Sequence, residues 1–91
     1  MKRLTLKIYG DVQDVGFRLN IKKMAGEFSI VGWVRNDKDG AVSVVAEGED
    51  VELNKLLDYC AEGPRLAMVE DVKEKWDFVK KLSFTNFEIK Y

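Results

Sequence analysis

The 91-residue sequence contains no histidine, and this absence restricts its chemistry more than any other. Histidine is the most common general base at neutral pH and a common metal ligand. The single cysteine, Cys60, can form neither an internal disulfide nor a thiolate metal cluster. It falls within an apolar helical pattern, so we expect a buried structural thiol. Any catalysis must use other side chains, and we expect neither a metal nor a cofactor.

The sequence also lacks an excess of charge and a long apolar run. Its 15 basic and 16 acidic side chains give a formal net charge of -1, without the basic field that nucleic-acid binding requires. Within residues 1–10, charged and apolar side chains alternate from the third position, without the continuous apolar stretch of a signal peptide or a membrane span. We therefore expect a cytoplasmic monomer that binds neither nucleic acid nor membrane. A chain this short forms one domain, residues 1–91.

Several segments have the alternating apolar pattern of strands with one buried face. Two of them, rich in valine and tryptophan, flank a turn containing Asp39 and Gly40, and this Asp-Gly pair is a strong hairpin signal. A later segment carries charges on both faces and is typical of an exposed edge strand. The predicted strands are residues 3–9, 30–36, 41–47, 68–76 and 84–91.

Two other segments repeat apolar residues every three or four positions, which places these residues on one face of a helix. We predict Asp50 as the N-cap of the second helix and Gly63 with Pro64 as its stop signal. The predicted buried faces are Phe17, Ile21, Met24, Ala25 and Phe28 in the first helix, and Leu53, Leu56, Leu57 and Cys60 in the second.

The element order is β-α-β-β-α-β followed by one further strand. This order predicts an α+β fold, a two-layer ferredoxin-like sandwich in which two helices cover one face of an antiparallel sheet. The architecture hosts enzymes, RNA binders and metal carriers alike. An RNA binder would need an aromatic-rich third strand, but residues 41–46 contain no aromatic residue. A metal carrier would need paired cysteines, which are absent.

The loop between the first strand and the first helix has a glycine near each end, Gly10 and Gly16. Such a loop can turn its backbone N–H groups inward, and the start of the helix adds to the same positive concavity. Arg18 follows, and its planar guanidinium can bind two phosphate oxygens at once. We interpret the loop as an anion site. From spacing alone, a tight turn with a surface arginine is the favoured interpretation, since short glycine patterns are weak motifs.

Two segments resemble the signatures of the acylphosphatase family. The first consists of Gly10, Val12, Gln13, Val15, Gly16, Phe17 and Arg18. The second consists of Gly32, Trp33, Val34, Arg35, Asn36, Asp39, Gly40 and Val42. Residues 86–91 also resemble the family's C-terminal strand, so the resemblance spans essentially the whole chain.

The resemblance implies an enzyme, an acylphosphatase that cleaves the carboxyl–phosphate anhydride of small-molecule acyl phosphates, with inorganic phosphate as a product. It implies that Arg18 binds the phosphate and that Asn36 orients the attacking water, without a metal. An amide suffices for this role because the substrate already carries a good leaving group. The implied phosphate-binding loop comprises Val12, Gln13, Asp14, Val15, Gly16, Phe17 and Arg18.

Asp14 departs from the family pattern, which commonly has glycine at this position. Aspartate adopts positive φ only at some energetic cost, and it brings a negative charge toward an anion site. An alternative hypothesis follows from this residue. The chain would then be a non-catalytic family member that binds a phosphorylated ligand or a partner protein through the same loop.

Overall fold

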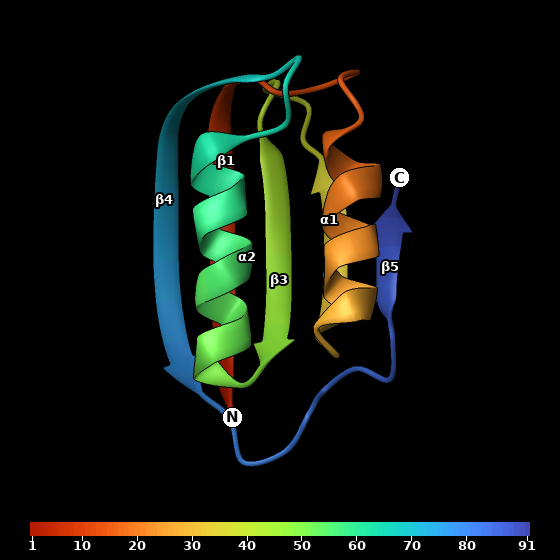
Figure 1. Cartoon of the computed structure of the whole chain (residues 1–91), viewed down its shortest axis with the longest axis vertical. Helices are drawn as coiled ribbons and strands as arrows, with labels where there is room; N and C mark the ends of the chain where they lie inside the picture. Colours follow the sequence, from red (N-terminus) through yellow and green to blue (C-terminus); the bar gives the residue numbers. More distant parts are fainter.

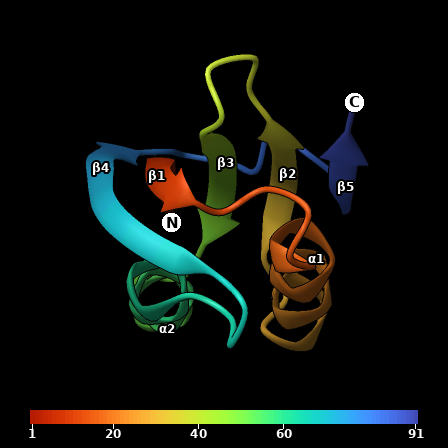
Figure 2. The ribbon, with the colours of Figure 1, turned by 90° about the horizontal axis from the view of Figure 1, so that it is seen from above.

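Two helices cover one face of a five-stranded sheet in the computed structural model, which describes residues 1–91 (Figure 1). An end-on view shows both helices on the same side of the sheet, with the other face left open (Figure 2). The predicted two-layer α+β fold and element order are confirmed. The elements are β1 (Lys2–Asp11), α1 (Phe17–Glu27), β2 (Val31–Asn36), β3 (Val42–Gly48), α2 (Asp50–Glu62), β4 (Met68–Phe78) and β5 (Phe87–Lys90).

The strand order across the sheet is β4-β1-β3-β2-β5, and one pairing differs from the prediction of an antiparallel sheet. Strand β5 pairs parallel with β2, with Gly32 opposite Phe87. After β4 the chain passes across the end of the sheet to the opposite edge before β5 begins (Figure 1). Consequently β5 runs in the same direction as β2, and the sheet is mixed.

The core lies between the sheet and the two helices, where the predicted periodicities place it. Alternate residues of β1 point toward the helices, and Leu4, Leu6 and Ile8 are at most 1% exposed. Burying a large aliphatic side chain stabilises a fold by roughly 1.5–3 kcal/mol, so these strands and helices hold one another in place. Cys60 is buried as predicted, and this burial raises the pKa of its thiol to about 12. Neither helix has the length and apolar content needed to cross a bilayer.

The strand ends differ from the sequence predictions by at most three residues, and the start of α2 differs by one. Asp50 is the first residue of α2 and Glu49 occupies the N-cap, so the prediction of Asp50 as the cap was wrong by one position. The Asp50 carboxylate instead lies 3.3 Å from Lys2 Nζ, an ion pair that the local sequence does not reveal. Strand β5 is shorter than predicted and begins at Phe87; in the segment before it, the Ser83 N–H donates to the Glu47 carboxylate of β3 at 2.6 Å.

Candidate active site

A pocket of about 240 Å³ opens at the end of the sheet where β1 ends and α1 begins. Asn36, the last residue of β2, reaches the same pocket from the sheet. Ile89 in β5 and Tyr91 directly after this strand form another wall of the pocket. The lining residues are Val12, Asp14, Gly16, Phe17, Arg18, Leu19, Asn36, Ile89 and Tyr91.

The loop before α1 presents unpaired backbone N–H groups. None of the N–H groups of residues 13–19 donates a hydrogen bond within the protein, and the first donor in the helix is the N–H of Asn20, bonded to the Gly16 carbonyl at 3.1 Å. Helix α1 also begins without a side-chain cap. Unpaired N–H groups and the positive end of the helix dipole make this segment suited to an anion.

Glycine is required where the loop leaves β1. Gly10 has φ of +128° and lies at an irregularity in the pairing of β1 with β4. A Cβ atom at this position would lie 2.2 Å from the Met68 carbonyl oxygen, closer than any side chain tolerates. Gly16, with φ of 79°, then turns the chain into α1. Between them, Asp14 adopts φ of 61°, so an aspartate occupies a left-handed conformation that glycine adopts at lower cost.

Arg18 lies in the first turn of α1 and is half-buried at the edge of the pocket. The central carbon of its guanidinium lies 5.3 Å from the centroid of the Tyr91 ring, a cation–π contact. The guanidinium forms no ion pair with a carboxylate of the chain. Its donors are therefore available to a bound anion.

Asn36 is the most unusual polar residue of the pocket. Its Oδ1 atom is buried and has no hydrogen-bond partner. A buried acceptor without a partner costs about 1–3 kcal/mol, so a protein retains one only where something compensates. Within the pocket, a bound water or ligand can supply the missing donor.

Arg18 and Asn36 thus line one pocket, but only part of the predicted loop does. Val12, Asp14, Gly16, Phe17 and Arg18 line the pocket, whereas Gln13 and Val15 do not. The Val15 side chain packs against the core, and the Gln13 side chain bonds the β2–β3 hairpin.

Three apolar residues that the sequence analysis did not assign to the site complete the pocket: Leu19, Ile89 and Tyr91. Leu19 is 66% exposed and the Tyr91 side chain is fully exposed. The alternating pattern at the end of the chain predicted a strand there, but only its parallel pairing with β2 brings Ile89 and Tyr91 beside Asn36. An exposed leucine directly after Arg18 was the one signal available in the sequence.

Sequence comparisons show which protein family the chain resembles over its length. The sequence profile of the acylphosphatase family matches residues 4–89. An acylphosphatase from Oceanobacillus iheyensis is 39% identical over the full length of both chains, and one from Thermococcus kodakarensis is 43% identical over 85% of this chain and 87% of its own. The chain belongs to the acylphosphatase family.

Solved structures agree with this assignment. The crystal structure of an acylphosphatase from Bacillus subtilis superposes with a TM-score of 0.92 at 29% identity, covering all of both chains. An acylphosphatase from Coxiella burnetii superposes with a TM-score of 0.87 at 32% identity, covering 98% of this chain and 92% of its own. The prediction of an enzyme of this family is confirmed.

Proposed function

We propose that the chain hydrolyses the carboxyl–phosphate anhydride bond of acyl phosphates, with Arg18 and the loop before α1 holding the phosphate and Asn36 orienting the water. The observation that carries the proposal is that Asn36, whose buried Oδ1 has no hydrogen-bond partner, lines the same pocket as Arg18. An anion site alone would need only the arginine and the loop. An unpaired acceptor beside that site suits a water held for attack.

We place the phosphate on the polar side of the pocket, beside Arg18 and the start of α1. The N–H groups of Asp14 and of residues 16–19 belong to pocket-lining residues and are unpaired, and they can donate to the phosphate oxygens while Arg18 binds two oxygens through its planar guanidinium. Both sets of donors are fixed before binding, so little reorganisation accompanies the reaction. The acyl group then lies toward Leu19, Ile89 and Tyr91, the apolar side of the pocket.

The proposed step is attack of water on phosphorus. The Asn36 side chain accepts one hydrogen bond from the water through Oδ1 and directs its oxygen toward the phosphorus. The new P–O bond forms as the bond to the acyl oxygen breaks, and the carboxylate leaves with that electron pair. The proton of the water passes to a phosphate oxygen, so the products are a carboxylate and inorganic phosphate. No histidine is required, in agreement with the composition.

The direct test compares an acyl phosphate with a phosphate monoester of similar shape. Benzoyl phosphate should be hydrolysed rapidly and phenyl phosphate not measurably, since only the anhydride has a leaving group that departs without protonation. Both assays are repeated with EDTA, which should leave the rates unchanged. Equal rates on the two substrates, or loss of activity with the chelator, would contradict the proposed chemistry.

Asp14 favours a second candidate, a non-catalytic protein that binds a phosphorylated ligand through the same loop. Its exposed carboxylate lines the pocket and repels a dianion. The two functions predict different outcomes in one experiment. Inorganic phosphate should inhibit benzoyl phosphate hydrolysis competitively if the pocket is catalytic, whereas phosphate binding without any turnover would support the second candidate.

A further inference from the structure

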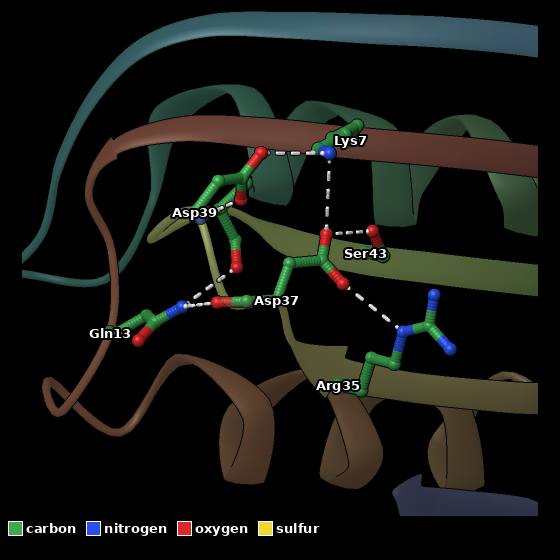
Figure 3. Close-up of polar contacts among 7 residues, drawn as sticks. Lys7, Gln13, Arg35, Asp37, Asp39 and Ser43 are labelled. Carbon is green, nitrogen blue, oxygen red and sulfur yellow. Dashed lines mark hydrogen bonds and ion pairs between the residues drawn. The ribbon is translucent and has the colours of Figure 1, made fainter. Parts of the chain in front are cut away.

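Gln13 joins the phosphate-binding loop to the β2–β3 hairpin. Its side-chain Nε2 donates to two backbone carbonyl oxygens of the hairpin, that of Asp37 at 2.8 Å and that of Ala41 at 2.9 Å (Figure 3). Both amide hydrogens are therefore used, and both bonds have normal length. Gln13 is part of the loop by sequence, yet it lies outside the pocket lining. Its side chain serves the hairpin and not the ligand.

The two carbonyls that Gln13 binds also close the hairpin. The N–H of Asp37 donates to the Ala41 carbonyl at 2.8 Å, and the N–H of Gly40 donates to the Asp37 carbonyl at 3.2 Å. Residues 37–41 follow Asn36 directly, and Asn36 pairs with Val42 across the same hairpin. A displacement of the hairpin therefore moves the backbone of Asn36.

Side chains on the open face of the sheet hold the other side of the hairpin (Figure 3). The Asp37 carboxylate accepts hydrogen bonds from the Ser43 hydroxyl and from Arg35 Nε, the latter at 3.1 Å. The Asp39 carboxylate lies 2.9 Å from Lys7 Nζ and accepts from the Ala41 N–H at 3.0 Å. These contacts hold the hairpin to β1 and β3, so Gln13 binds a part of the backbone that is already fixed on its other side.

Asn36 depends on this backbone support because its Oδ1 atom has no hydrogen bond to fix it. We propose that Gln13 is a positioning residue, which sets the distance between the phosphate-binding loop and Asn36 by holding the hairpin with two hydrogen bonds. The inference rests on the proposed role of Asn36 in orienting water. Gln13 itself then touches neither phosphate nor water, and its effect on hydrolysis passes through Asn36.

The first test separates turnover from phosphate binding. Gln13→Met keeps the length of the side chain but removes both donors, and it should lower kcat about 10- to 100-fold, since a misplacement of about 1 Å can cost this much. The inhibition constant of inorganic phosphate should stay within about twofold. Gln13→Leu, a second uncharged variant without donors, should behave in the same way. Equal losses of kcat and phosphate affinity would show that Gln13 shapes the loop instead, and would overturn the proposal.

Asn54→Ala is the matched control. The Asn54 side-chain amide also donates to a backbone carbonyl, that of Asp50 at 2.9 Å, but it lies on the exposed face of α2, away from the pocket. Its loss should change neither kcat nor phosphate inhibition. Thermal unfolding of all variants shows whether a change in kcat accompanies a general loss of structure.

The second test follows Asn36 directly by nuclear magnetic resonance. In Gln13→Met the side-chain amide signal of Asn36 should shift or broaden, while the backbone signal of Arg18 stays in place. In the Asn36→Ala background, Gln13→Met should cause no further loss of kcat. Full activity of Asn36→Ala alone would refute the role of Asn36, and with it the proposed function. An unmoved Asn36 signal, or additive losses of kcat, would refute only the positioning role of Gln13.

Discussion

The pocket at one end of the sheet and the surroundings of Glu47 at the other end differ in how their polar groups are paired. At the pocket end, the N–H groups of residues 13–19 and the buried Oδ1 of Asn36 have no partner in the protein. At the other end, the fully buried Glu47 carboxylate is paired on both oxygens, with Arg3 Nε at 2.7 Å and the Ser83 N–H at 2.6 Å.

In this small fold, the polar groups that can bind a ligand and the polar groups that stabilise the protein lie at opposite ends of the sheet. Unpaired groups at the pocket end cost folding free energy and keep their hydrogen-bonding capacity for a ligand. The paired carboxylate at the other end stabilises the fold, because it fastens the segment between β4 and β5 to β3. Substitutions at the two ends share no contacts, so their effects should be independent.

Arg18 offers the largest expected effect on the pocket end. Arg18→Ala should lower kcat/KM for benzoyl phosphate about 1,000-fold, and Arg18→Lys at least about 100-fold, since lysine supplies charge without the two-pronged geometry. Phosphate inhibition should weaken in both variants. The melting temperature should remain nearly constant, because the Arg18 guanidinium forms no ion pair within the protein and stacks on the exposed ring of Tyr91. A lysine variant with most of the original kcat/KM would remove the arginine from the proposed mechanism.

Asn36→Ala should lower kcat about 100-fold while phosphate inhibition stays nearly constant, because its proposed partner is the water. The same variant should be as stable as the original protein or more stable, since it removes a buried acceptor that has no partner. Kinetics and thermal unfolding of one preparation test both statements. If Asn36→Ala lowers both the melting temperature and kcat, then the Asn36 side chain makes stabilising hydrogen bonds in the folded protein, and it does not differ from Glu47 in the way described above.

Most of the fold was predictable because it depends on local periodicity. The alternation of Leu4, Leu6 and Ile8 fixes the buried face of β1, and the Asp39–Gly40 pair fixes the hairpin. The parallel pairing of β5 was not predictable, since it depends on where the chain crosses after β4. Along that crossing Ser83 bonds Glu47, a contact between residues 36 positions apart that the local sequence pattern does not reveal.

The candidate site was predictable only as far as its motifs extend along the chain. Arg18 and Asn36 were found through the family resemblance, and the structure places both at one pocket. Ile89 and Tyr91 reach the pocket through the pairing of β5 with β2, so they were missed. The role of Gln13 was missed for a similar reason, since its partners Asp37 and Ala41 are distant in sequence.

Glu47→Gln should be the converse of Asn36→Ala, destabilising the protein while leaving kcat unchanged. Loss of charge-assisted hydrogen bonds at a buried site costs about 2–3 kcal/mol, which lowers the melting temperature by about 10–20 °C in a domain of this size. Glu70→Gln, at an exposed carboxylate without an ion pair, is the control and should cost little.

The stability difference between the original protein and Glu47→Gln should depend on pH. Burial alone raises the pKa of the Glu47 carboxyl, but the hydrogen bonds from Ser83 and Arg3 outweigh burial and hold the pKa below its ordinary value of 4.5. A carboxylate with a lowered pKa contributes its stability above the unfolded-state value and loses it as the pH falls through the folded-state value. The two melting temperatures should thus differ most above about pH 5 and converge on acidification. A constant difference down to pH 3 would contradict the pairing.

The smallest expected effect concerns Asp14, the one acidic residue among those that line the pocket. Because Asp14 is exposed, its repulsion of a phosphate about 8 Å away is about 0.5 kcal/mol per unit charge, or about 1 kcal/mol for a dianion. Asp14→Asn removes this charge and keeps a side chain that tolerates the positive φ, so phosphate should bind about fivefold more tightly at low salt. Salt at about 1 M should remove most of the gain. Asp14→Gly should bind phosphate as tightly as Asp14→Asn and differ from it only in stability. Glycine relieves the strain of the positive φ in the folded state, but it also raises the conformational entropy of the unfolded state, and the two effects oppose each other. If glycine alone tightens phosphate binding, then the backbone conformation of the loop, and not the charge, sets the affinity of the pocket.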